Sequence, residues 1–236
     1  MVGGSVSEME GKMVSEMVCQ PPTPKRNKLV IDLSSNNSPL VDNDLQNIGG
    51  VIVKLTEGTG YIDPVASAYI NIARRRNVLV AGYHFFHPEM DLRKQADLFT
   101  SQLKLHNIRR GFVDCELDVN GTVNSNMIGP EWNRLKYLTL AFMKDINHLG
   151  YTSGLYTDLN FYLHGIQAPA YPLWIAAYPF ALNNLTPVEA VSKLQSMKPP
   201  APTAVLWQYT DNCHLPSQSC DASYYYGTKM GAFFNA

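Results

Sequence analysis

Long apolar segments are missing from this sequence of 236 residues, in which no eighteen apolar residues follow one another. No membrane-spanning helix is therefore expected. An excess of charge of either sign is missing too, since 19 basic and 20 acidic side chains leave a formal net charge of −1. That balance predicts neither a basic surface for nucleic acid nor an acidic tail. Membrane insertion and nucleic-acid binding are thus not expected of this chain.

Three further signals are absent. The first residues, MVGGSVSEMEGKMVSEMV, carry acids where a secretory signal has an apolar core, so no signal peptide is expected. No glycine-rich phosphate loop follows the first predicted strand, which disfavours nucleotide binding. The four cysteines form no CxxC motif and no Cys/His pair at ligand spacing, so neither zinc nor another metal or cofactor is expected. Cys213 and Cys220 bracket a short loop, and both a disulfide and free thiols remain open there.

What is present divides the chain into two parts. Residues 1–27 are polar and end in the linker-like QPPTPKRNK, whereas residues 28–236 alternate short apolar runs with helical patterns. Continuously apolar strands that alternate with helices indicate a parallel sheet, and about eight strands in this length indicate a closed α/β barrel. The helices thin out after the fifth strand, so the second half of the barrel is expected to be irregular. The expected strands lie near 28–35, 50–58, 78–86, 111–119, 153–158, 173–178, 204–210 and 221–227.

Acidic residues stand near the ends of several of these strands, where barrel enzymes carry their chemistry. In GFVDCELDV, Asp114 and Glu116 are two residues apart, so a strand would place them on one face about 7 Å apart. Two like charges there would raise one pKa and keep a proton available for acid catalysis. An isolated pair of this kind is more often structural, but Asp32 and Asp221 at other strand ends favour an active site.

Aromatic and amide side chains accompany these acids. The candidates for substrate contacts are Tyr83, Tyr156, Trp174, Tyr178 and Gln208, with packing an equal alternative for Trp174. Lys54 and Glu57 are expected to form an ion pair at the rim. Sugar rings stack on aromatic faces, and a carboxylic acid can protonate the leaving oxygen of a glycoside. Carboxylates and aromatics without metal ligands therefore favour glycoside hydrolysis.

Seven motifs together resemble the family 25 glycoside hydrolases, lysozymes of the Chalaropsis type that include many phage endolysins. They are IDLSSNN, VIVKLTEGTGYIDP, VAGYHFFHP, VDCE, GLYTD, LWIAAYP and LWQYTD, in this order within residues 28–227. The resemblance implies a (β/α)₅(β)₃ barrel and cleavage of the β-1,4 bond between N-acetylmuramic acid and N-acetylglucosamine in peptidoglycan. It implies an acid/base role for Glu116 and places Asp114, Asp32 and Asp221 at the other acidic positions. The sequence CDASYYY around Asp221 departs from the usual VDLN of the family.

Alternatives follow from the same residues. A non-catalytic glycan-binding or virion structural module could keep the barrel, although the intact acids argue against it. A chitinase would carry a longer DxxDxDxE motif, which GFVDCELD lacks. Peptidoglycan strands are the expected substrate, and a phage virion or the host cytoplasm before release is the expected location. Residues 1–27, where Met9, Met13 and Met17 recur every four residues, are expected to dock onto a phage structural protein or onto the barrel itself.

Overall fold

The computed structural model describes residues 27–123 and 126–236. The predicted tail, residues 1–27, falls outside the described residues except for Asn27, so its docking role stays a prediction. From residue 28 the chain alternates strands and helices, as its sequence pattern indicates. No helix in the described ranges has the length and apolar character needed to cross a bilayer.

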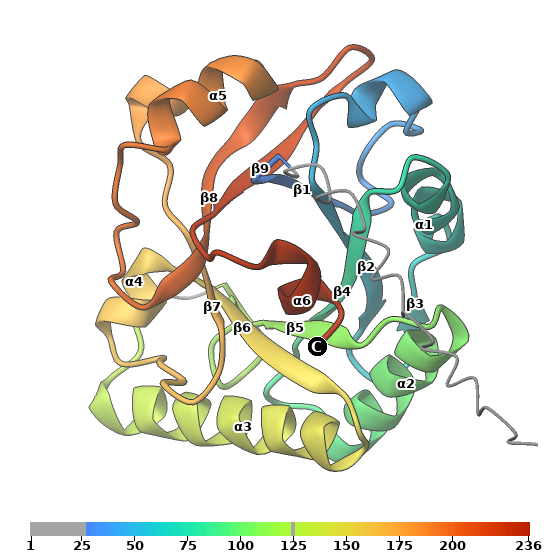
Figure 1. Cartoon of the computed structure of the whole chain (residues 1–236). Helices are drawn as coiled ribbons and strands as arrows, with labels where there is room; N and C mark the ends of the chain where they lie inside the picture. Colours follow the sequence, from blue (N-terminus) through green and yellow to red (C-terminus); the bar gives the residue numbers. More distant parts are fainter. Residues whose placement is uncertain (1–26, 124–125) are drawn as a thin grey trace, which may run out of the picture.

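In the described part of the chain, nine strands form one sheet, and eight of them close into a barrel (Figure 1). The strands are β1 (Leu29–Leu33), β2 (Gly50–Glu57), β3 (Tyr61–Ile62), β4 (Leu79–Phe85), β5 (Arg110–Asp114), β6 (Thr152–Asp158), β7 (Leu173–Ala176), β8 (Ala204–His214) and β9 (Ser219–Tyr225). Neighbouring barrel strands from β1 to β8 run parallel. β9 closes the barrel by pairing antiparallel with both β8 and β1, while β3 forms a small hairpin on β2.

Helices cover the outside of the barrel unevenly. The covering helices are α1 (Ala66–Arg75), α2 (Leu92–Leu105), α3 (Gly129–His148), α4 (Leu159–Leu163) and α5 (Pro187–Leu194), with 3₁₀ turns η1 (Asp42–Leu45) and η2 (Phe180–Leu182); a further helix, α6 (Met230–Phe234), lies at one end of the barrel. The three long helices α1, α2 and α3 follow β2/β3, β4 and β5, whereas later connections are shorter, as the sequence predicts. The result is the irregular α/β barrel expected from the sequence. Asp91 caps α2 by accepting a hydrogen bond from the Lys94 amide, and Gly150, at φ +90°, follows α3.

Two apolar cores result from this arrangement. The outer core lies between the strands and the covering helices and includes Phe99 of α2 and Phe142 of α3. Phe99 packs so closely on β5 that a Cβ at Gly111 would stand 2.6 Å from its ring, which explains glycine at that position. The inner core fills the barrel with residues such as Phe112 and Leu206.

Helix α6 closes one end of the barrel and lies in its centre when viewed along the barrel axis (Figure 1). Phe234 of α6 is 1% exposed and belongs to the inner core. A Cβ at Gly50, where β2 begins, would stand 2.7 Å from the Phe234 ring. Since Gly50 is at the amino end of β2, α6 seals the end of the barrel opposite to the carboxyl ends of the parallel strands.

The β8–β9 hairpin carries Cys213 and Cys220, for which the sequence allowed either a disulfide or free thiols. Cys213 and Cys220 are direct partners across the two antiparallel strands, and both are buried free thiols. The hydroxyl of Tyr209 donates to Cys213 Sγ at 3.7 Å. The pairing places the two side chains next to each other without a bond between them.

Candidate active site

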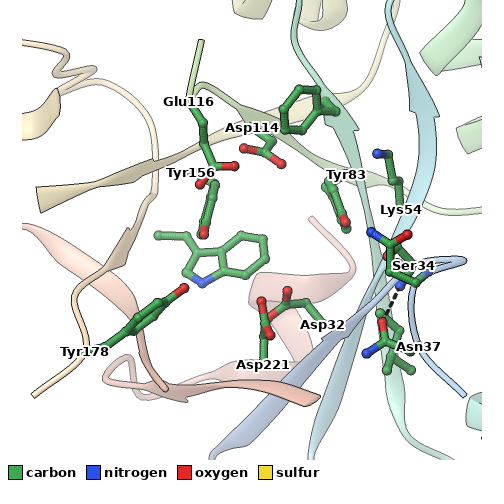
Figure 2. Close-up of a pocket in the computed structure, with 14 residues that line it drawn as sticks. Asp32, Ser34, Asn37, Lys54, Tyr83, Asp114, Glu116, Tyr156, Tyr178 and Asp221 are labelled. Carbon is green, nitrogen blue, oxygen red and sulfur yellow. Dashed lines mark hydrogen bonds between the residues drawn. The ribbon is translucent and has the colours of Figure 1, made fainter. Parts of the chain in front are cut away.

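A polar pocket of about 310 Å³ opens where the parallel strands end. It is lined by Asp32, Leu33, Ser34, Asn36, Asn37, Lys54, Tyr83, Phe85, Asp114, Glu116, Tyr156, Trp174, Tyr178 and Asp221. All predicted site residues except Gln208 are therefore brought together in one pocket. Figure 2 shows Asp32 and Asp221 close together on one side, with Asp114 and Glu116 on the other.

Asp32 and Asp221 face each other because they are register partners in the antiparallel β1–β9 pair. Asp32 stands near the carboxyl end of β1. Asp221 stands near the amino end of β9, which reaches the same rim because β9 runs in the opposite direction. Burial, and then the charge of Asp221, raises the pKa of Asp32 well above its ordinary value. Burial and the charges of Asp211 and Glu116 raise the pKa of Asp221 to about 7.

Asp114 and Glu116 come from the end of β5, but by a different route from the one predicted. The strand ends at Asp114, so strand alternation does not extend to Glu116. Instead Cys115 is fully buried on the outside of the barrel, with its Sγ 3.4 Å from the Thr139 hydroxyl of α3. This outward anchor leaves the residues on either side facing the pocket, as the predicted common face requires.

The environment of this second pair also favours protonation. Burial, and then the charge of Glu116, raises the pKa of Asp114 well above its ordinary value. The pKa of Glu116 is raised by burial and by the charge of Asp158, and an interaction with Tyr156 partly offsets that rise. Asp114 Oδ1 is buried and accepts no hydrogen bond from the described residues. A buried acceptor without a donor is costly unless a bound molecule supplies one.

Gln208 lies beneath the pocket instead of lining it. Its side chain is buried, and its Nε2 donates to Asp32 Oδ2 at 3.0 Å and to Asp221 Oδ2 at 3.3 Å. Its Oε1 accepts hydrogen bonds from the hydroxyls of Tyr156, at 2.7 Å, and Tyr178, at 2.6 Å. The predicted inward direction of this side chain is therefore observed, but its partners are other site residues.

Aromatic rings form the floor and wall of the pocket. Trp174 is 2% exposed, donates from Nε1 to the Ser223 hydroxyl at 2.9 Å, and packs on Tyr156 with ring centroids 4.3 Å apart. The predicted packing role is therefore observed, and because Trp174 also lines the pocket, its contact with substrate stays a prediction. Tyr178 is 43% exposed and stands at the rim.

Two groups of polar residues complete the rim. Lys54 donates to Glu57 Oε2 at 2.6 Å, which confirms the predicted ion pair, and Glu57 Oε1 lies 3.1 Å from Nε2 of His87. Sequence reasoning missed the loop of Ser34, Asn36 and Asn37, in which Asn37 Oδ1 accepts from the Ser34 amide at 2.8 Å. The run SSNN directly after the first predicted strand was the available signal.

Burial and mutual repulsion raise the pKa of all four acids, which favours a transferable proton in the pocket beside carboxylates that stabilise positive charge. Among the described residues, no group of three or more His, Cys, Asp or Glu side chains is arranged to hold a metal ion. A transferable proton beside carboxylates suits acid-catalysed cleavage of a glycosidic bond.

Comparison with known protein families decides the affiliation. The model of the glycosyl hydrolases family 25 matches residues 31–218, well over half of the chain. The chain belongs to glycosyl hydrolase family 25. This confirms the resemblance read from the seven motifs. A search of curated proteins finds no match.

Solved structures share the fold of this family 25 chain. A muramidase from Trichobolus zukalii is 20% identical, with a TM-score of 0.66, and the match covers 88% of this chain and 98% of that one. The bacterial lysozyme from Streptomyces coelicolor is 20% identical, with a TM-score of 0.67 and coverage of 88% and 96%. The catalytic domain of endolysin ply40 from bacteriophage P40 of Listeria monocytogenes is 19% identical, with a TM-score of 0.67 and coverage of 88% and 97%.

Family membership defines the broad activity of the chain. It is a glycoside hydrolase of the lysozyme class, and the family implies peptidoglycan as its substrate.

Proposed function

We propose that this family 25 enzyme cleaves the β-1,4 bond between N-acetylmuramic acid and N-acetylglucosamine, with Glu116 as the general acid. The observation that carries the proposal is one pocket in which four carboxyl groups of raised pKa face aromatic side chains. A general acid must hold its proton at the working pH, and burial and the charge of Asp158 raise the pKa of Glu116 in that direction.

Glu116 suits the acid role better than its neighbours do. Asp32 and Asp221 already accept hydrogen bonds from Gln208, which favours their ionised forms. Glu116 lies beyond the end of β5 and is partly exposed, so it can reach a glycosidic oxygen and later exchange a proton with water. The same residue then serves as general base in the second step.

For the first step we favour assistance by the 2-acetamido group of the substrate. Its carbonyl oxygen forms a bond to the anomeric carbon while the glycosidic bond breaks and Glu116 transfers its proton to the leaving oxygen. Asp114 Oδ1, which lacks a donor, is positioned to accept the acetamido N–H, and Asp32 is the alternative for this task. Water then attacks the anomeric carbon, breaks its bond to the acetamido oxygen and gives a proton to Glu116. The product keeps the configuration of the substrate at this carbon.

This mechanism differs from direct attack by a carboxylate, which forms a glycosyl ester on the protein. The test is to trap the intermediate during turnover and to analyse the intact protein by mass spectrometry. We expect no covalent adduct, and we expect inhibition by a thiazoline analogue of the cyclised acetamido group. A glycosyl ester found on Asp114 or Asp32 would refute the assisted mechanism.

The activity itself is tested on purified peptidoglycan. We expect soluble fragments that carry N-acetylmuramic acid at the new reducing end, identified by borohydride reduction and mass spectrometry. Glu116→Gln, assayed in parallel, controls for contaminating hydrolases. Reducing ends of N-acetylglucosamine, or no fragments at all, would contradict the proposed specificity.

The sequence also predicts a phage enzyme that degrades the host cell wall, and we retain this as part of the proposal. The similarity to the catalytic domain of endolysin ply40 supports it, while fungal and bacterial structures match with comparable TM-scores. Lysis of bacteria that coexpress the chain with a holin, and their survival without the holin, would support release from the cytoplasm. Detection of the chain in purified virions would support the alternative of a virion-associated lysin.

A further inference from the structure

We infer that Gln208 is a positioning residue that sets the hydrogen-bond polarity of the active site and holds Asp32 and Asp221 as acceptors. The inference rests on the proposed function, because it assigns a task within that same site. Gln208 is 1% exposed and lies on β8, next to β9. It touches two carboxyl groups and two phenol hydroxyls, which come from four different strands or strand ends.

The hydrogen-bonding capacity of the Gln208 amide is used completely within the protein. A primary amide offers two N–H donors and two carbonyl lone pairs. The donors go to Asp32 Oδ2 and Asp221 Oδ2, and the lone pairs accept the hydroxyls of Tyr156 and Tyr178. No position on the amide remains for a substrate, so the contact with substrate predicted from the sequence is replaced by a role behind the contacting residues.

The orientation of the amide follows from its partners. If the amide were turned over, Oε1 would face two carboxyl groups, and both would have to carry a proton to donate to it. In the observed orientation the N–H groups stabilise the ionised carboxylates, and the hydrogen bond from Gln208 lowers the pKa of Asp32 against the effect of burial. Gln208 therefore opposes the protonation that burial and mutual repulsion favour.

The same orientation determines what the two tyrosines present to the pocket. Each hydroxyl has one proton, and in both tyrosines that proton points to Gln208 Oε1. Their lone pairs are therefore free to accept hydrogen bonds. Gln208 therefore sets the hydrogen-bond polarity of both tyrosine hydroxyls as well as that of the two carboxyl groups.

Other ionisable groups also face these carboxylates and define the background of any pH experiment. Asp32 responds to Asp221 and Glu116, and Asp221 responds to Asp211 and Glu116. Burial, and then the charges of nearby acids that include Asp32 and Asp221, raises the pKa values of the Tyr83 and Tyr178 hydroxyls. None of these groups changes when Gln208 is replaced by an uncharged side chain, so a shift would report the loss of the amide.

The first test is Gln208→Met, which keeps the approximate volume and removes all four hydrogen bonds. We expect kcat to fall about tenfold or more, because a hydrogen bond to a charged group is worth one to two factors of ten, with KM nearly unchanged. We also expect the acidic limb of the kcat/KM profile to move to higher pH, since the pKa values of Asp32 and Asp221 rise. A raised KM with an unchanged pH profile would instead indicate a substrate contact and overturn the inference.

Gln95→Met is the matched control. Gln95 is also buried and makes three hydrogen bonds, one with His84 and two with the backbone of His87, but it lies outside the pocket. The control should lose stability without moving the acidic limb. An equal shift in both variants would show that the effect is general destabilisation and would also overturn the inference.

Gln208→Glu keeps the shape of the side chain and guards against failure of the first variant to fold. When protonated, the new carboxyl can accept from the tyrosines and donate to one aspartate; when ionised, it repels both. We therefore expect the activity of Gln208→Glu relative to wild type to rise as the pH falls, in contrast to Gln208→Met. A constant ratio across the pH range would contradict the assigned role.

A readout without substrate separates this inference from the proposed function. Side-chain carboxyl carbons of Asp32 and Asp221 can be titrated by ¹³C NMR in the wild type, in Gln208→Met and in Gln95→Met. We expect upward shifts of both titrations in Gln208→Met alone. If the wild type released no fragments from peptidoglycan, the proposed function would fail while this titration still decided the role of Gln208; unshifted titrations would overturn it.

Discussion

At the residue scale, one substitution isolates the transferable proton. Glu116→Gln replaces the acid with an amide of the same shape as its protonated form, so we expect a folded protein. Its kcat on peptidoglycan should fall by about 10²- to 10⁴-fold, the usual contribution of general acid/base catalysis. Circular dichroism and thermal melting check the fold alongside the assay. Turnover near the wild-type rate would remove Glu116 from the role of general acid.

Individual residues also show how far the sequence could predict the site. Acid and aromatic residues at strand ends identified the pocket because strand ends meet at one rim in any barrel. The partners of Gln208 could not be predicted, since Asp32 is 176 positions away in the sequence. Ser34 and Asn37 were missed because a short polar run after a strand is typical of any loop, and only the fold places it beside the acids.

At the element scale, two predicted strands placed their acidic residues correctly, although the structural reason differs from the predicted one. The sequence pattern predicts one strand over 111–119, but β5 ends at Asp114. The outward contact of Cys115 with Thr139, and not strand alternation, leaves Asp114 and Glu116 facing the pocket. The last predicted strand, near 221–227, is β9, and its antiparallel direction could not be derived from local pattern. That direction brings Asp221 to the rim, in spite of its unusual surrounding sequence.

Helix α6 allows a test of stability that leaves the chemistry intact. Phe234→Ala should open a cavity at the sealed end of the barrel and lower the free energy of unfolding by about 3–5 kcal/mol. Urea denaturation measures the loss, and kcat below the melting temperature should remain near the wild-type value. Phe180→Ala is the control, because Phe180 is 93% exposed and its removal should leave stability unchanged. Equal stability of the two variants would contradict the sealing role of α6.

The β8–β9 hairpin allows a second test, on the cysteines. Because Cys213 and Cys220 are buried free thiols, we expect alkylation without reductant to modify neither residue in the native state and both after unfolding. Intact mass and peptide mapping give the count. A mass two hydrogens lower, with both residues unreactive in denaturant, would show a disulfide. Such a bridge would restrain the strand that carries Asp221 and could add about 2–3 kcal/mol on a chain-entropy model.

At the scale of the whole molecule, the buried acids of the active site lower the free energy of unfolding at neutral pH. A carboxyl whose pKa is raised by folding holds a proton that the unfolded chain has lost, so its contribution to stability falls as the pH rises. For Asp221 that contribution is complete below about pH 4 and is lost as the pH passes about 7. His84, whose pKa burial lowers to about 4, acts in the opposite sense between pH 4 and 6.5. Wild-type stability alone therefore mixes both effects.

Asp221→Asn separates the two effects, because His84 is unchanged in the variant. Each unit of pKa difference is worth about 1.4 kcal/mol, so the variant should gain a few kcal/mol relative to wild type as the pH rises from about 4 to 8. Denaturant melts of both proteins at pH 4, 6 and 8 measure this difference, and activity should fall in the same variant. The burial and neighbouring charges that raise the pKa of Asp221 also lower the free energy of unfolding at neutral pH. A site that needs protonated and ionised acids in one buried pocket therefore reduces the stability of the barrel. If the variant gained nothing between pH 4 and 8, Asp221 would not be held in a destabilising environment.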